Sequence, residues 1–454
     1  MNRVSGMKNG QKQGWKRLLA GACVALLCAQ LPAAVAFAAV EKVSIGDQLV
    51  KINVQRLDLG GCGLNDITEL AKLTKLIALD LSNNEITDLT PLAKLTKLNE
   101  LDLSGNEITD LAPLAKLTKL GKLNLARNAI TDIGPLAGMT RLTALDLSHN
   151  QVASVVPLAP MQRLTKLYLQ NNRIAEALPL ASLPLLKEVW MQDNPATDLL
   201  ALRALPDLRV LRVSTNNAEM ISQMDQIAEL AVWGDEIDDI LPLVKMRLRV
   251  FSLSSSALTD IAMLPQMNTL KELTLAADKL TDLEALARFK SIQKLSLTCA
   301  KITDLASLSK MPELAELELN CYELGAIAPL GNAKKLRSLS LSVDDMPDLS
   351  VLNRFKHLRA LTLYSGDMLD LTCIARLSRL TEVSVRGEQL ADITALAAMK
   401  ELKTVVIESD TRVDCTPLAG LNKLRSLTLR GKSYAPEQVA LLRAMLPQCE
   451  VRFE

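Results

Sequence analysis

A motif of 22 residues recurs along most of the chain and constrains the fold more than any other feature. The stretch 76–97, LIALDLSNNEITDLTPLAKLTK, shows it in its most regular form. A period of this length is typical of a solenoid, in which each unit stacks on its two neighbours. Successive units begin at Val54, Leu76, Leu98, Leu120, Leu142, Leu164, Leu186, Leu208, Ile227, Leu248, Leu270, Ile292, Leu314, Leu336, Leu358, Leu380, Leu402 and Leu424.

Positions 1, 4 and 6 of every unit are apolar. Because side chains alternate between the two faces of a strand, this pattern predicts a short strand whose positions 1, 4 and 6 face the core and whose positions 2, 3, 5 and 7 face outward. The second half of each unit is too short for a long helix and often holds a proline, such as Pro91 or Pro113. It predicts an extended segment and a helical turn.

The full pattern, L-x-x-L-x-L-x-x-N/C-x-L, is typical of leucine-rich repeats. The predicted fold class is therefore an α/β solenoid, a leucine-rich-repeat arc with a parallel concave β-sheet and short helical or 3-10 turns on the convex side. Stacked leucine columns need few rings, which agrees with a composition of 49% hydrophobic and 3% aromatic residues. At position 9, we expect an asparagine ladder that pairs buried backbone groups from Asn84, Asn106, Asn128, Asn150, Asn172, Asn194 and Asn216.

The repeat spacing fails between Leu208 and Leu248, and beyond this point asparagine no longer fills position 9. We expect one continuous solenoid that bends here. The aspartate at position 13, as in Asp88, is expected to cap the convex turn. The predicted organisation is 1–38 signal peptide, 39–53 N-terminal cap, 54–217 regular repeats, 218–247 irregular repeats, 248–432 divergent repeats and 433–454 C-terminal cap.

The first 38 residues resemble an export signal, with Lys16 and Arg17 before an apolar run and Ala36-Phe37-Ala38 as a cleavage site. An uncleaved membrane anchor is the alternative, because 18–40 is long enough to cross a bilayer. Cleavage would leave a secreted, periplasmic or cell-surface protein without stable membrane insertion. It would also remove basic residues only and turn the formal charge of +1 slightly negative, so nucleic acid is not an expected partner.

Catalytic chemistry has little support in the sequence. The chain has two histidines, His149 and His357, which lie far apart. They provide neither a nucleophile–base pair nor a histidine metal site. We therefore expect no enzyme activity, no cofactor and no metal.

The outward strand positions are the expected binding surface, because the core does not require their side chains. Tyr168, Trp190 and Arg212 follow one another at position 5, and Trp233 lies on an outward position nearby. Tyrosine, tryptophan and arginine dominate the energetics of many protein interfaces. These four residues are the predicted partner-binding patch, although Trp233 could instead fill space where the irregular units pack poorly.

Position 5 begins as an acidic column in the first units, formed by Asp58, Asp80, Asp102 and Asp146, with Asn124 between the last two. Two interpretations remain open: the column keeps the sheet face soluble, or it attracts a basic partner. A calcium site is disfavoured, because aspartates one unit apart do not form a loop of mixed carboxylate and carbonyl ligands.

Cys299 and Cys321 both occupy position 8 of successive units. Stacking would place their Cα atoms about 5 Å apart, within the range of a disulfide. The pair is a candidate cross-strand disulfide if the chain is exported. The alternative is a pair of free, buried thiols.

The unit LxxLDLSxNxITDLxPLAxLTx resembles the 22-residue leucine-rich repeats of the bacterial internalins over residues 54–432. This resemblance implies an exported scaffold that grips a protein partner on its concave face. The chain departs from the family in having no helical N-terminal cap of the usual size, no immunoglobulin-like continuation and no L-P-x-T-G anchor. We therefore expect a non-enzymatic scaffold for an unidentified host or envelope protein, with an envelope-organising protein or a carbohydrate-binding adhesin as alternatives.

Overall fold

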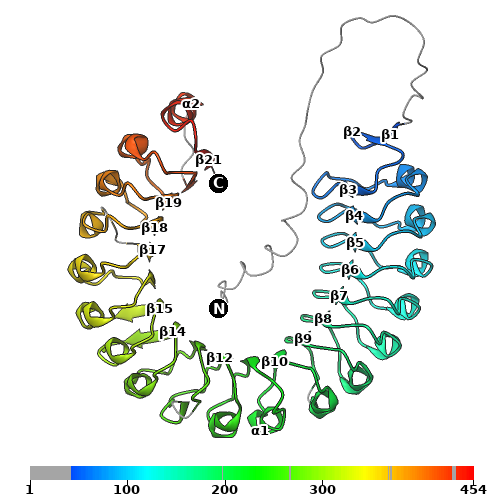
Figure 1. The fold of residues 1–454 in the computed structure, drawn as a ribbon, viewed down its shortest axis with the longest axis horizontal. Coiled ribbons are helices and arrows are strands. Elements are labelled where there is room, and N and C mark those ends of the chain that lie inside the picture. Colours follow the sequence, from blue (N-terminus) through cyan, green and yellow to red (C-terminus); the bar gives the residue numbers. More distant parts are fainter. Residues whose placement is uncertain are drawn as a thin grey trace, which may run out of the picture. The chain divides into compact units, whose positions relative to one another are not determined.

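The computed structural model describes residues 42–196, 198–264, 267–366, 368, 371–431 and 436–453. The predicted signal peptide, 1–38, lies outside the described residues, as do 39–41 of the predicted N-terminal cap and 433–435 and 454 of the C-terminal cap. The unit that begins at Lys42 is a solenoid whose repeats follow one another along an arc (Figure 1). It opens with an antiparallel hairpin of β1 (Lys42–Ile45) and β2 (Gln48–Lys51).

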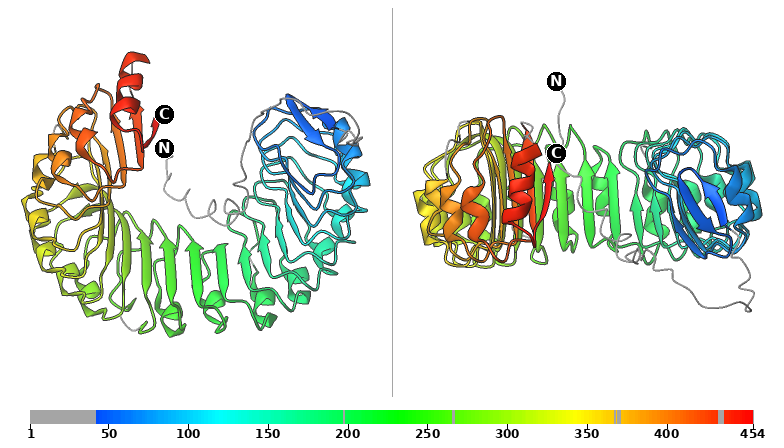
Figure 2. Two further views of the ribbon diagram at one scale, coloured as in Figure 1. Left: turned by 45° about the horizontal axis from the view of Figure 1, so that its top comes forward. Right: turned by 90° about the horizontal axis from the view of Figure 1, so that it is seen from above.

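One parallel sheet lines the inner side of the arc, and short helices cover its outer side (Figure 2). Each strand from β4 to β20 pairs with its two neighbours in the chain, and no register between β21 and β3 is present among the described residues. The sheet consists of β3 (Arg56–Asp58), β4 (Ala78–Asp80), β5 (Glu100–Asp102), β6 (Lys122–Asn124), β7 (Ala144–Asp146), β8 (Lys166–Tyr168), β9 (Glu188–Trp190), β10 (Val210–Ser214), β11 (Glu229–Trp233), β12 (Val250–Ser254), β13 (Glu272–Ala276), β14 (Lys294–Ile302), β15 (Glu316–Leu324), β16 (Ser338–Ser342), β17 (Ala360–Tyr364), β18 (Glu382–Arg386), β19 (Thr404–Ser409), β20 (Ser426–Gly431) and β21 (Glu450–Phe453).

The convex side is built from 3-10 turns, as the short and proline-containing half-units predict. Asp88 Oδ1 accepts a hydrogen bond from Thr90 N at 2.8 Å, which fixes the start of the turn, and the equivalent aspartates of other units do the same. The described turns are η1 (Thr68–Lys72), η2 (Thr90–Lys94), η3 (Ala112–Leu114), η4 (Gly134–Leu136), η5 (Val156–Leu158), η6 (Leu178–Ser182), η7 (Leu200–Ala204), η8 (Leu241–Lys245), η10 (Glu284–Arg288), η11 (Leu308–Lys310), η12 (Ala328–Asn332), η13 (Ser350–Arg354), η14 (Thr372–Ile374), η15 (Thr394–Ala398) and η16 (Thr416–Gly420).

The core is a continuous set of leucine columns between the sheet and the turns. Positions 1, 4 and 6 are buried in almost every unit, as in Leu98, Leu101 and Leu103, each 0% exposed. The predicted inward direction of these positions is confirmed. Burial of so much aliphatic surface is the main force that holds the units together.

Two kinds of turn follow the strands. From β3 to β9 the strands are three residues long, and position 8 has a positive φ, as in Asn83 (55°), Arg127 (57°) and Asn171 (56°). From β10 onward the strands are longer and position 8 is buried in most units, so that Ser255, for example, is 1% exposed. The change coincides with the failure of the 22-residue spacing.

The asparagine ladder belongs to the first kind of turn. Asn150 Oδ1 accepts from Ile130 N at 3.0 Å, and its Nδ2 donates to Leu125 O at 2.9 Å and Leu147 O at 3.0 Å. Asn84, Asn106, Asn128, Asn172 and Asn194 repeat this pattern.

The inclusion of Asn216 in the ladder was wrong. Asn216 is exposed, and its amide bonds to Glu236, with Nδ2 to Oε2 at 3.0 Å. Its unit is three residues short and forms α1 (Ala218–Ser222) on the convex side in place of a 3-10 turn. Asn217 caps this helix by accepting from Met220 N at 2.8 Å. The sheet nevertheless stays continuous through β9, β10, β11 and β12, whereas the expected bend stays a prediction.

The chain ends in a helix, α2 (Pro436–Met445), followed by β21, which pairs in parallel with β20. Leu442, Leu446 and Val451 are buried, at 6%, 5% and 8% exposure. These side chains cover the last leucine columns, which would otherwise face solvent.

Candidate functional site on the concave sheet

Three of the four predicted patch residues contact one another on the concave face. Tyr168, Trp190 and Arg212 are in register on β8, β9 and β10. The Tyr168 and Trp190 ring centroids lie 4.8 Å apart with an interplanar angle of 65°, an edge-to-face arrangement. Arg212 Cζ lies 3.9 Å from the ring centroid of Trp190, in cation–π geometry. We call these three residues the Trp190 stack.

Trp233 is placed elsewhere. Arg212 pairs in register with Ala231, whereas Trp233 lies two residues further along β11 and pairs with Ser214 and Ser254. Trp233 is partly buried, and no ring contact joins it to the Trp190 stack in the described part of the chain. Its membership of the predicted patch, like its alternative packing role, stays a hypothesis.

The charges around the Trp190 stack are arranged in neighbouring pairs. Glu188 Oε2 lies 2.8 Å from Lys166 Nζ, and Glu229 forms an ion pair with Arg249. Burial lowers the pKa of Arg212 from its usual value, while Glu188 and Glu229 act in the opposite direction. Burial and the nearby Glu188 raise the pKa of Tyr168. At neutral pH the stack therefore presents a neutral phenol and a cationic guanidinium.

Two glutamines belong to the same place and were not singled out from the sequence. Gln170 and Gln192 occupy position 7, on the units of Tyr168 and Trp190, where nearby units hold serine or alanine. Gln170 Oε1, Gln192 Oε1 and Trp190 Nε1 are buried and have no hydrogen-bond partner among the described residues. Buried polar atoms are paired in most proteins, so such atoms on two adjacent units distinguish this part of the sheet.

The acidic column has a structural role that the sequence interpretations did not include. The position-5 side chain accepts a hydrogen bond from the backbone N–H of position 7, as Asp80 Oδ1 does from Ser82 N at 2.8 Å and Asp146 Oδ1 from Ser148 N at 2.9 Å. Asp58, Asp102 and Asn124 make the same contact. These residues fix the end of each short strand, and a role in attracting a basic partner stays a hypothesis.

Burial raises the pKa of Asp146, and Ser148 opposes this by hydrogen bonding. A carboxyl whose pKa is higher in the folded than in the unfolded state binds its proton more tightly when folded, so the folded protein loses stability as pH rises through that interval. We expect Asp146→Asn to raise the melting temperature by roughly 1–2 °C at pH 7. The gain should vanish below about pH 3.5, where Asp146 is protonated in the folded and the unfolded protein and is neutral like the asparagine that replaces it.

The neighbouring Asn124 shows that an amide fits this position, because its Oδ1 accepts from Ala126 N at 3.1 Å. Asp58→Asn is the matched control, since Asp58 makes the same contact, to Gly60 N at 3.0 Å, but is exposed. Thermal unfolding between pH 3 and pH 8 measures both variants. An equal gain in the control, or a loss in Asp146→Asn at every pH, would contradict the burial argument.

Cys299 and Cys321 are register partners on β14 and β15, as predicted, and both are buried free thiols in this structure. Burial raises the pKa of Cys299 to about 12 and that of Cys321 to about 11. Thiolates, which carry out disulfide exchange, are therefore scarce at neutral pH. The disulfide stays a prediction, and the mass of the non-reduced peptide pair decides it.

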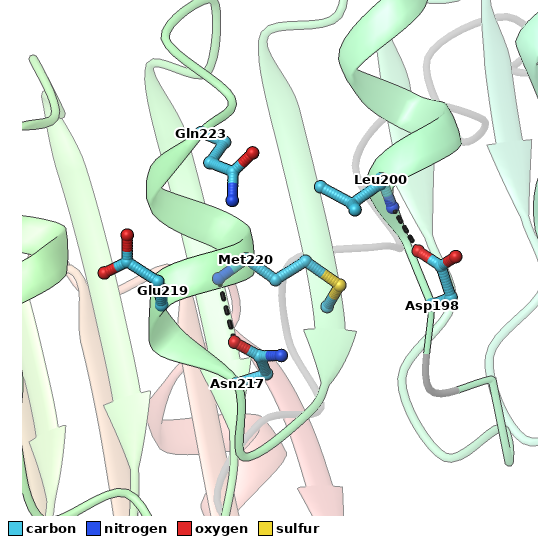
Figure 3. A pocket seen from close by; sticks show the side chains of 6 residues that line it. All are labelled: Asp198, Leu200, Asn217, Glu219, Met220 and Gln223. Carbon is cyan, nitrogen blue, oxygen red and sulfur yellow. Dashed lines mark hydrogen bonds between the residues drawn. The ribbon is translucent and has the colours of Figure 1, made fainter.

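A hollow of about 290 Å³ lies on the convex side, where α1 replaces the usual turn (Figure 3). Leu200 and Met220 form its apolar part, and Asp198 and Asn217 lie beside them. Of its four polar side chains, Asp198 accepts from Leu200 N at 2.9 Å and Asn217 from Met220 N at 2.8 Å, and the other two are Glu219 and Gln223. The hollow therefore follows from the short unit and offers less chemistry than the Trp190 stack.

Within the described residues, no group of three or more histidine, cysteine or acidic side chains is placed to hold a metal ion. His149 lies in the turn after β7 and His357 is exposed in the segment before β17, several units away. The same part of the chain contains no helix with the length and apolar character that a membrane span requires.

Comparison with known proteins identifies the repeats. The family model described as leucine-rich repeats (2 copies) matches residues 52–94, 74–116, 96–138 and 118–160. No curated protein matches the sequence. A leucine-rich-repeat protein of Leptospira interrogans is similar over 88% of this chain and 96% of its own, with 20% identity and a TM-score of 0.51, which shows the fold.

Internalin C2 of Listeria monocytogenes is 32% identical in sequence over 42% of this chain and 87% of its own, with a TM-score of 0.39. Internalin F of the same organism is 23% identical over 84% of this chain and 89% of its own, with a TM-score of 0.37. The leucine-rich-repeat fold suggests a scaffold for protein–protein interaction, and proteins of this class are generally not enzymes. By the sequence of its 22-residue units and by its fold, the chain is a leucine-rich-repeat protein, and its repeats are similar in sequence to those of a bacterial internalin.

Proposed function

We propose that this protein is an exported, non-enzymatic recognition scaffold that binds a protein partner on its concave face, with the Trp190 stack as the centre of the contact. The observation that carries the proposal is the stack itself. Tyr168, Trp190 and Arg212 are partly buried side chains that contact each other on an outward face, where the core does not need them.

The stack has the properties of an interface hot spot. Two aromatic rings and a guanidinium supply a large contact area with few rotatable bonds, and their mutual contacts hold them in place before a partner arrives. In contrast to the stack, position 5 is mostly acidic in the first units and mostly small and polar from β12 onward, as in Thr274, Ser340 and Thr362. Export is supported by the residue pattern of 1–38, which lies outside the described residues.

Trp190→Ala tests the proposal. We expect this variant to weaken partner binding by roughly 2 kcal/mol or more, about a 30-fold loss of affinity, because truncation removes the ring on which both Tyr168 and Arg212 pack. Partners are first captured from the extracytoplasmic fraction and from candidate host material with wild-type protein. Their affinities for the two proteins are then measured by surface plasmon resonance.

Thr362→Ala is the matched control, because Thr362 also occupies position 5 but lies on β17, far from the stack along the sheet. It should change binding little. Equal effects of the two substitutions, or a marked fall in melting temperature for Trp190→Ala alone, would show that Trp190 is a packing residue.

A further inference from the structure

We propose that Arg212 receives a carboxylate from the partner, so that the protein recognises an acidic segment, with an aspartate, a glutamate or a free C-terminus seated beside the Trp190 ring. This inference rests on the proposed function and specifies the chemistry of the partner. It follows from how Arg212, and the groups around it, are paired in the structure.

The Arg212 guanidinium has unused hydrogen-bonding capacity. It stacks on Trp190, but no described residue accepts a hydrogen bond from it or forms an ion pair with it. A guanidinium presents five N–H donors in a planar fork. With Cζ held over the indole ring and no described acceptor on its N–H groups, these donors are available to a ligand.

The two glutamates that stabilise the charge of Arg212 already form ion pairs with other cations. Glu188 pairs with Lys166 at 2.8 Å, and Glu229 pairs with Arg249. Other sheet cations also have acidic partners, in the pairs Arg56–Glu100, Lys122–Glu100, Lys294–Glu316, Arg386–Glu408 and Arg452–Glu450. Arg212 is thus a sheet cation that the protein holds in place without neutralising it.

The surroundings make that cation a good receptor. Burial lowers the pKa of Arg212, which reflects the cost of removing water from the charge. A partner carboxylate would replace the lost water contacts with two charge-assisted hydrogen bonds. Trp190 Nε1, on the same two units, is an unpaired donor to which a carboxylate oxygen can bond. Gln170 Oε1 and Gln192 Oε1 are acceptors, and backbone N–H groups of the partner segment would pair with them.

The charge balance favours a monoanion. Glu188 and Glu229 are paired with Lys166 and Arg249, so Arg212, the only position-5 cation from Asp58 to Ser252, offers a ligand one positive charge that no described residue pairs with. A carboxylate monoanion would balance this single charge, whereas a phosphate dianion would leave one negative charge without a cationic partner. We therefore assign the site to a carboxylate and not to a phosphorylated side chain.

The test uses a displayed random-peptide library selected on the whole protein. We expect wild type to enrich peptides with a recurrent acidic residue, and synthetic versions to bind at least 10-fold more weakly when that residue becomes its amide. On Arg212→Gln, the acid and amide versions should bind equally. Arg212→Lys should recover only part of the preference, because an ammonium lacks the fork. Arg386→Gln, which changes a sheet cation already paired with Glu408, should retain the full preference.

The outcomes separate this inference from the proposed function. Peptides that require Trp190 but bind as well without an acidic residue would overturn the role of Arg212 and leave the concave site intact. A preference for phosphorylated over carboxylate peptides would overturn the assignment of the anion. A library that yields no peptide dependent on Trp190 would overturn both proposals.

Discussion

Asn150→Ala is expected to lower the free energy of unfolding by about 3 kcal/mol, because it leaves a buried backbone donor without an acceptor. The substitution removes the acceptor of Ile130 N, which is bonded at 3.0 Å within the core, and leaves that N–H without a partner. It also removes donors to Leu125 O and Leu147 O, which keep their bonds to Asn128 and Asn172. Urea unfolding followed by circular dichroism measures the loss.

Asn216→Ala is the control for the same repeat position. Asn216 is exposed and bonds to Glu236 outside the ladder, so its removal should change the free energy of unfolding by about 0.5 kcal/mol or less. The two substitutions delete the same atoms from equivalent places in the sequence. Similar losses in both would mean that the ladder does not carry the stability assigned to it.

Gly234→Ala is expected to destabilise the protein by about 3 kcal/mol, because a methyl group has no room at this position. A Cβ on Gly234 would lie 2.3 Å from Thr215 O and 2.7 Å from Ile237 Cδ1. The first of these is a backbone atom of the residue that directly follows β10, so relief requires backbone movement at the junction between the two kinds of turn. Thermal and urea unfolding of the variant measure the cost.

Gly138→Ala provides the comparison, since a Cβ there would meet only Thr118 Cγ2, at 3.9 Å. It should be tolerated within about 0.5 kcal/mol. A stable Gly234→Ala variant with unchanged peptide binding would show that the junction yields easily, and that the close approach of its backbone segments has little energetic importance.

The sequence predicts the layers of this fold because each depends on a repeated local choice. Leu101 and Leu103 are inward because strands alternate, and Asp88 starts a turn because its carboxylate reaches the N–H two residues on. Many copies of one pattern average out local exceptions. The residues of the core, the sheet and the turns can therefore all be predicted from the sequence.

The exceptions lie where the spacing changes. Position 216 carries the asparagine that the ladder pattern requires, but the short unit exposes this side chain to solvent. The identity of the residue alone does not predict its exposure. Trp233 could have been separated from the patch by sequence alone, because it occupies position 7 of its unit whereas Trp190 occupies position 5. The Gln170 and Gln192 substitutions at position 7 were also visible, as a change from serine and alanine beside Tyr168 and Trp190.

The contacts of the Trp190 stack needed the structure. Alternation indicates that three side chains share a face, but not that Arg212 lies over the indole or that Glu188 and Glu229 bond elsewhere. Those outcomes depend on rotamers and on competition among nearby cations. Sequence patterns carry no direct record of either.

The two kinds of turn restrict how a chain of this sort can grow or be redesigned. A unit from before β10 carries at position 8 a residue in left-handed backbone, such as Arg127 or His149, whereas later units bury that position, as in Ser255 and Ala277. Transplanting an early unit beside β12 would force a large polar side chain into the leucine columns. Repeats are therefore interchangeable within each half of the solenoid but not between the two halves. Units can be duplicated on either side of the junction, whereas the irregular units at the junction have to be kept together.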